Sequence, residues 1–165
     1  INKFKKAFPE ITIATDIIVG FPGEIDAEFQ DTIKLLEETQ PDVINLSRFS
    51  PRPQTLAAKM KPVATNIAKE RSKRATEVMK PIMKERNALW KGWAGTILID
   101  EYGKNNIMIG RNYAYKPVLV GGNHKLGEEI EVTIKDTATY DLRAFEREEV
   151  QEEETSKQEL IQLRT

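Results

Sequence analysis

The first sixty residues contain two apolar runs separated by an amphipathic stretch. Ile11–Val19 and Val43–Phe49 are rich in β-branched and other apolar residues, which is typical of strands buried in a parallel sheet. Between them, Phe29, Ile33 and Leu36 recur at the spacing of one helical face. This order of strand, helix and strand predicts a βαβ unit with parallel strands.

The next stretch has the pattern of a long basic helix. Asn66–Lys91 carries apolar residues on one side and is interrupted by Pro81, which should kink or split the helix. From Lys59 to Lys91 there are ten Lys or Arg residues and three Glu residues. Two interpretations stay open for this charge: contact with phosphates, or a helix face that is merely solvated.

After residue 94 the apolar pattern changes to short alternating segments separated by Gly-containing turns. Alternation with a period of two predicts strands, and several short strands at this spacing predict a small β-barrel. The five predicted strands are Thr96–Asp100, Asn106–Gly110, Pro117–Val120, Glu129–Ile134 and Leu142–Phe145.

Composition excludes several classes of site. The chain has no cysteine, so it cannot form disulfides or supply thiolate nucleophiles, zinc ribbons or cysteine-held clusters. No apolar run approaches the about 20 residues that span a membrane, and we expect no membrane partner. The chain starts at Ile1 rather than Met, which we interpret as a fragment or a processed product.

The β region resembles a TRAM domain, an OB-like RNA-binding barrel. The matching features are the LIDEYGK hairpin, the IGRNYAYKPVLV strand-loop-strand, the LGEEIEVTI strand and the closing DTATYDLRA. They are preceded by TDIIVGFPGE and SRFSPRP, which resemble the end of the radical S-adenosylmethionine (radical SAM) barrel in tRNA methylthiotransferases. The residues of these motifs are most similar to those of the archaeal and eukaryotic methylthiotransferases of the threonylcarbamoyladenosine type. The resemblance extends from Ile11 to Phe145.

This resemblance implies a transferase that uses S-adenosylmethionine and two 4Fe–4S clusters. The family adds a methylthio group to C2 of N6-threonylcarbamoyladenosine next to the tRNA anticodon. The cluster ligands are absent from this chain and would lie upstream of Ile1, so we assign no catalytic residue and no metal ligand. We expect the chain alone to be inactive and to bind neither cofactor by itself.

The predicted fold class is a partial α/β barrel (βαβ), a helical linker and an all-β, OB-like five-stranded barrel. The predicted parts are residues 1–62, the end of the radical SAM barrel; 63–92, a basic helical linker; 93–145, the TRAM barrel; and 146–165, an acidic tail. Two strands of an α/β barrel cannot bury both faces alone.

The resemblance places a cofactor-binding wall where the two parallel strands end. We predict that Asp16, Gly20, Gly23, Glu24 and Phe49 line it, because glycines allow close backbone approach and an aromatic ring can pack against adenine. The alternative is that Gly-Phe-Pro-Gly is only a tight turn, with Glu24 as a carboxylate at the start of a helix.

The predicted RNA-binding residues combine cations with aromatic rings, as single-stranded RNA requires. They are Arg48, Arg52, Lys104, Arg111, Asn112, Tyr113, Tyr115, Lys116 and Lys125. Alternatives remain open: Arg48 and Arg52 could pair with carboxylates, and one of the two tyrosines is expected in the barrel core. Trp90 and Trp93 are expected to pack at the junction before the barrel.

The sequence therefore predicts a cytoplasmic protein whose partner is the anticodon stem-loop of tRNA. It would supply tRNA binding and part of the cofactor wall of a methylthiotransferase. Two alternatives remain: a stand-alone TRAM-type RNA-binding protein without catalysis, and an interaction module whose basic helix and acidic tail bind proteins.

Overall fold

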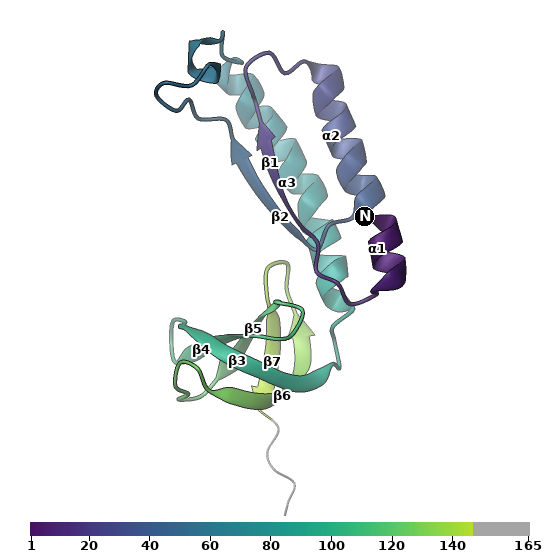
Figure 1. Ribbon diagram of the computed structural model, residues 1–165, viewed down its shortest axis with the longest axis vertical. Coiled ribbons are helices and arrows are strands. Elements are labelled where there is room, and N and C mark those ends of the chain that lie inside the picture. The colour runs from purple at the N-terminus through teal and green to yellow at the C-terminus, as the bar shows by residue number, and fades with distance from the viewer. Residues whose placement is uncertain (147–165) are drawn as a thin grey trace, which may run out of the picture.

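The computed structural model describes residues 1–146, which form an α/β part followed by a β-barrel (Figure 1). The α/β part consists of α1 (Asn2–Ala7), β1 (Ala14–Val19), α2 (Asp26–Thr39), β2 (Val43–Arg48), the short 3-10 helix η1 (Ala57–Lys59) and α3 (Thr65–Ala88). The barrel consists of β3 (Ala94–Tyr102), β4 (Ile107–Arg111), β5 (Pro117–Gly121), β6 (Glu129–Thr137) and β7 (Leu142–Glu146). The predicted fold class is confirmed. The predicted acidic tail, apart from Glu146, lies outside the described residues.

The parallel pair β1 and β2 is covered by helices on one face. Ile17 lies opposite Leu46 in the register, and both pack against α2 and α3. Val19 is fully buried on this face, whereas Asp16 and Ile18 on the other face are exposed. The two-stranded sheet therefore has one packed face and one open face.

Helix α3 belongs to the core of the α/β part. Residues 63–92 were predicted as a linker, yet α3 contributes Ala75, Met79 and Met83 to the same clusters as α2 and the strands. Pro81 was predicted to kink or split the helix; splitting is wrong, because α3 runs unbroken through Pro81. Pro81 is exposed, so water can satisfy the carbonyl that loses its hydrogen bond.

The barrel closes in the strand order β3-β4-β5-β7-β6, with β5 and β7 parallel and the other pairs antiparallel. Its interior is filled by alternate residues from every strand, among them Ile99, Val118, Val132 and Leu142, each fully buried. Trp90, which follows α3, also belongs to this core. The alternating pattern in the sequence thus predicted a five-stranded barrel correctly.

A buried polar network joins the two parts. Lys116 from the barrel places Nζ 3.0 Å from Oδ1 of Asn87 and 3.6 Å from Oδ1 of Asp42. Arg86 Nε donates to the same Asp42 oxygen at 2.9 Å, and Asn87 Nδ2 donates to the Ala138 carbonyl of the barrel at 2.8 Å. Asp42 and Lys116 are each 1% exposed. Burial lowers the pKa of Lys116, which is partly offset by the Asp42 carboxylate.

Within residues 1–146, none of the helices has the length and apolar character needed to span a membrane.

Candidate nucleic-acid interface

The loops after β1 and β2 lie at the end of the α/β part away from the barrel (Figure 1). They border a cavity of about 540 Å³ whose lining includes Gly20, Arg48 and Phe49. The ring of Phe49 is half-buried and packs edge-on against Phe21, with 5.1 Å between ring centroids. This cavity therefore brings together three of the residues predicted at the strand ends.

The Glu24 carboxylate is hydrogen-bonded to other residues of the fold. Its Oε2 accepts hydrogen bonds from the Gly20 backbone N–H and from Arg71 Nη1, both at 2.7 Å. The side chains of Glu24 and Arg71 are only 11% and 8% exposed. The prediction that Glu24 lines a cofactor surface does not fit this burial; the carboxylate instead ties the turn to α3, in agreement with the alternative structural interpretation.

Gly20 is required by packing. Its φ is +76°, and a Cβ at this position would lie 2.8 Å from the Cβ of Ala68 on α3. The glycine therefore lets α3 approach the end of β1. This close approach accounts for Gly20 without any ligand.

The Gly20→Ala variant should lower the free energy of unfolding by about 2–3 kcal/mol, because both the backbone and Ala68 resist the added methyl group. Gly127 is a matched control, since its φ is +83° and no atom would lie within 4 Å of its Cβ. Gly127→Ala should cost about 1 kcal/mol in the same urea titration. Equal losses of unfolding free energy in the two variants would contradict the steric role of Gly20.

The remaining residues predicted in the α/β part are dispersed. Asp16 lies on the open face of the sheet, where its Oδ1 accepts a hydrogen bond from Asn45 Nδ2 at 2.9 Å. It borders a different hollow from the strand-end cavity. Gly23 is exposed and has a φ of +91°. Arg48 and Arg52 are exposed and form no ion pair with another residue in the range 1–146, so the alternative that they pair with carboxylates is not seen there.

The β4–β5 loop is shaped by Asn112. Its Oδ1 accepts hydrogen bonds from the backbone N–H groups of Ala114 at 3.1 Å and Lys116 at 3.0 Å. Asn112 is 4% exposed and Lys116 is 1% exposed. The prediction that these two side chains contact RNA is therefore wrong: Asn112 builds the loop, and Lys116 is held in the network with Asp42.

Arg111, half-buried at the end of β4, and Tyr115, exposed on this loop, form a cation–aromatic pair. The Arg111 guanidinium carbon lies 4.8 Å from the centroid of the Tyr115 ring, and its Nε donates to Asp100 at 2.9 Å. Tyr115 is 72% exposed and has a φ of +62°. A fixed guanidinium beside an open ring can contact a phosphate and stack on a base.

Tyr113 lies on the other side of the loop and contacts the junction tryptophans. Its ring centroid is 6.0 Å from that of Trp90 and 6.1 Å from that of Trp93, and its hydroxyl donates to Glu10. Burial, followed by the contact with Glu10, raises the pKa of Tyr113 to about 12. Tyr113 is nevertheless 66% exposed, so the expectation that one of the two tyrosines belongs to the core is wrong.

Lys104 and Lys125 do not join this cluster. Ile107, at the start of β4, pairs with Gly121, so the loops that carry the two lysines lie at one end of the barrel. Arg111 lies at the other end of β4, four strand positions away, or about 13 Å. Both lysines are exposed, at the end of the barrel that does not carry Arg111.

The two groups of predicted residues are thus well separated. Helix α3 begins beside the strand-end cavity and ends at the barrel, and a helix of 24 residues is about 36 Å long. No pattern in the sequence indicates that residues 7–12 approach the β4–β5 loop, as the contact between Glu10 and Tyr113 shows they do.

Comparison with known proteins agrees with this arrangement. Residues 94–144 match the TRAM domain family. The chain is 38% identical over 136 residues to a probable threonylcarbamoyladenosine tRNA methylthiotransferase of Archaeoglobus fulgidus, which covers 82% of this chain and 32% of the relative. The corresponding protein of Pyrococcus horikoshii is 37% identical over 84% of this chain and 32% of its own length.

A bacterial relative carries a different name. The tRNA-2-methylthio-N(6)-dimethylallyladenosine synthase of Bacillus cereus is 35% identical over 86% of this chain and 29% of its own length. The chain spans about a third of the length of the curated relatives it matches. It contains a TRAM domain, and with the α/β segment before it the chain matches the carboxy-terminal region of the threonylcarbamoyladenosine tRNA methylthiotransferases.

Proposed function

We propose that this chain binds tRNA through its TRAM barrel and works in the cytoplasm as the carboxy-terminal part of a tRNA methylthiotransferase. The observation that carries the proposal is the pair of the half-buried Arg111 and the exposed Tyr115 on a barrel that matches the TRAM family. The reaction we propose is addition of a methylthio group to C2 of N6-threonylcarbamoyladenosine, and the RNA element is the anticodon stem-loop. The names of the relatives from Archaeoglobus and Pyrococcus support this substrate.

The iron–sulfur clusters expected from the resemblance do not fit this chain. It has no cysteine, and residues 1–146 contain no group of three His, Asp or Glu side chains that could hold a metal ion. We therefore derive no redox step from these residues. The chain by itself is expected to have no methylthiolation activity.

S-adenosylmethionine fits in part. The half-buried Phe49 ring and the exposed Arg48 border the strand-end cavity, where they can form one wall for an adenosine group. The cofactor, when bound, would supply the methyl group and the radical. The contribution of this chain is limited to positioning, with Phe49 as a packing surface and Gly23 in the adjoining turn.

A non-catalytic RNA-binding protein is the second candidate. RNA binding through the barrel needs no cysteine, so this function is open to the chain as it stands. Both candidates require the barrel to bind RNA, so one binding experiment tests what they share.

RNA affinity should fall steeply with salt, with a slope of about −0.7 in log K against log salt for each phosphate contact. Arg111→Ala should weaken binding about tenfold at low salt and reduce the magnitude of the slope by about 0.7, because one phosphate contact is lost. Fluorescence anisotropy with a labelled anticodon stem-loop measures both quantities.

Lys34→Ala is the control, since Lys34 is a 72% exposed cation on α2 and its loss changes the net charge equally. It should leave the salt slope unchanged. Absence of binding at low salt, or binding that does not respond to salt, would contradict the proposed function.

A further inference from the structure

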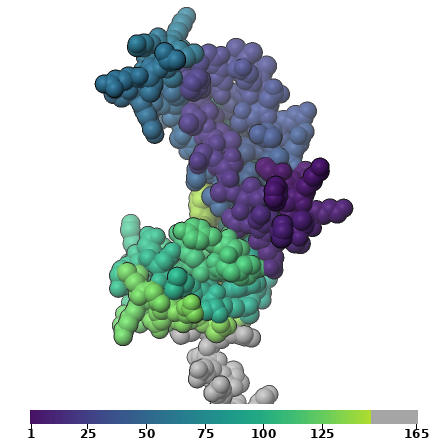
Figure 2. Space-filling model, in the orientation of Figure 1, coloured from purple at the N-terminus to yellow at the C-terminus, as the bar shows by residue number. Residues whose placement is uncertain are grey.

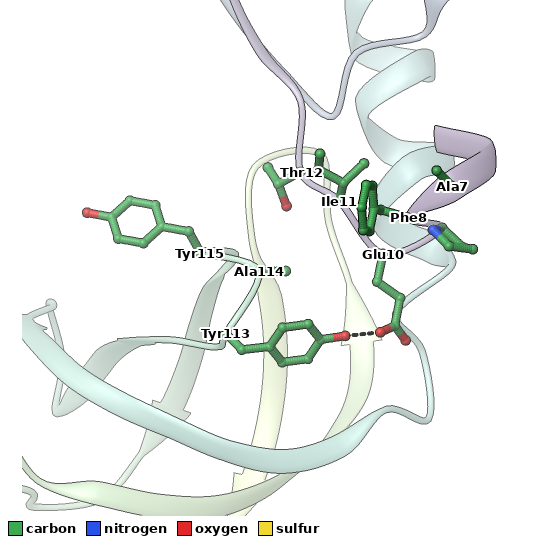
Figure 3. Close-up of a pocket in the computed structure, with 9 residues that line it drawn as sticks. Ala7, Phe8, Glu10, Ile11, Thr12, Tyr113, Ala114 and Tyr115 are labelled. Atoms are coloured by element: carbon green, nitrogen blue, oxygen red, sulfur yellow. Dashed lines mark hydrogen bonds between the residues drawn. The ribbon is translucent and has the colours of Figure 1, made fainter. Parts of the chain in front are cut away.

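An open groove lies between the segment before β1 and the β4–β5 loop of the barrel (Figure 3). Its volume is about 890 Å³, and it is lined by residues 7–12 on one side and 113–115 on the other. Figure 2 shows the amino-terminal segment lying directly against the barrel. The groove is therefore a composite of two segments that are far apart in the sequence.

Exposed aromatic rings surround this groove. Phe8 is 60% exposed, Tyr113 is 66% exposed and Tyr115 is 72% exposed. In Figure 3, Tyr113 extends across the groove toward Glu10, Phe8 lies above that carboxylate, and Tyr115 borders the far end with its ring pointing away from the other two. Large aromatic rings left open at the border of a concave surface are a feature of ligand sites.

The rings on the barrel side are held in place before any ligand binds. Tyr113 packs against Trp90 and Trp93 and donates its hydroxyl hydrogen to Glu10, while Tyr115 is paired with the Arg111 guanidinium. A platform whose rotamers are already fixed loses little conformational entropy when a flat ring stacks on it.

The charged groups at the groove are one carboxylate and two cations. Glu10 is the charged residue of the lining, and it accepts the Tyr113 hydroxyl hydrogen. At the edge, Arg111 stands beside Tyr115 while paired with Asp100, and Lys6 is exposed in the last turn of α1, next to Ala7 of the lining. Aromatic walls with flanking cations suit a base and its adjoining phosphates. An aromatic groove can also hold a proline-rich peptide, but such a peptide has no phosphates for these cations to contact.

We propose that this groove binds one unstacked nucleobase of the RNA, so that Phe8 and its neighbours form part of the RNA site together with the TRAM barrel. The proposal rests on the proposed function and extends it to residues outside the matched domain, which begins at residue 94. A barrel taken alone would lack one wall of the site.

The test uses the whole chain and a single-stranded RNA that contains 2-aminopurine, whose fluorescence is quenched by stacking. Phe8→Ala and Tyr115→Ala should each weaken binding about tenfold and reduce the quenching, because each removes a stacking surface. Tyr102→Ala is the matched control: Tyr102 is 66% exposed at the opposite end of β3–β4 from Arg111, and its removal should change neither quantity.

A second measurement separates this inference from the proposed function. Adenosine 5′-monophosphate should shift the NMR signals of Phe8, Tyr113 and Tyr115 in the whole chain. If it does so while RNA fails to bind, the groove takes a free nucleotide, and both the proposed function and the assignment of the groove to a base of the RNA are contradicted. If RNA binds with normal salt dependence but neither the Phe8→Ala variant nor the nucleotide has an effect, the groove assignment is overturned and the proposed function remains. A shift with a proline-rich peptide and none with the nucleotide would also overturn the assignment.

Discussion

Replacing Asp42 by asparagine should lower the free energy of unfolding by about 3–5 kcal/mol. The Asp42 carboxylate is 1% exposed and compensates two cations, Arg86 at 2.9 Å and Lys116 at 3.6 Å. The amide keeps the shape of the side chain but removes its charge, which leaves the Lys116 ammonium group buried beside Arg86 without an anion. Thermal and urea unfolding measure the loss.

The control is Glu38→Gln, which also removes one negative charge. Glu38 pairs with Lys34 at 3.8 Å, and both side chains are more than half exposed, so the change should stay below about 1 kcal/mol. A loss of similar size in the two variants would contradict the role of Asp42 as the anion that joins the two parts.

The loss of unfolding free energy in the Asp42→Asn variant should also depend on pH. Burial already lowers the pKa of Lys116 below 10.5 in the folded chain, and loss of the carboxylate lowers it further. Between the folded pKa and 10.5 the unfolded chain binds more protons, so stability rises with pH in that window. The difference in unfolding free energy between the wild type and the variant should therefore narrow as the pH approaches 10.5.

Replacing Trp90 by alanine should cost about 3–5 kcal/mol, because a large core side chain leaves a cavity. Trp90 is 7% exposed and belongs to the barrel core, although it precedes the first barrel strand. It also packs edge-on against Trp93, with 5.9 Å between centroids. Loss of the indole should thus destabilise the barrel and release Tyr113, which urea unfolding and near-ultraviolet circular dichroism can follow.

Leu89 provides the matched control for Trp90. It is the preceding residue and is 69% exposed, so Leu89→Ala should change the free energy of unfolding by no more than about 0.5 kcal/mol. A loss below 1 kcal/mol for Trp90→Ala would show that the indole is not part of the barrel core.

The strands and the helices α2 and α3 could be predicted from the sequence because their cause is local, whereas α1 (Asn2–Ala7) was not predicted. Each barrel strand alternates inward and outward residues, and Ile97, Ile99, Ile130 and Val132 are buried as that alternation requires. The alternation rule failed for Tyr113 and Tyr115 because both lie in a loop, where Tyr115 has a φ of +62°. Strand geometry does not apply to such a conformation.

The candidate site was harder to predict because its determinants are tertiary. In the sequence, Lys116 looks like any surface lysine. Only the fold places Asp42 and Asn87 of the α/β part beside its ammonium group. Glu24 likewise reads as a free carboxylate until α3 presents Arg71. Phe8 and Glu10 gave no signal, because their role depends on how the amino-terminal segment lies against the barrel.

The most direct test of RNA binding by this barrel is an NMR titration of the whole isotopically labelled chain with an anticodon stem-loop RNA. We predict salt-sensitive shifts at Arg111, Tyr113 and Tyr115. The strand-end cavity, at the other end of a helix of about 36 Å, is a separate surface. Absence of shifts at low salt, or shifts confined to the basic exposed side of α3 around Arg74, would contradict the account.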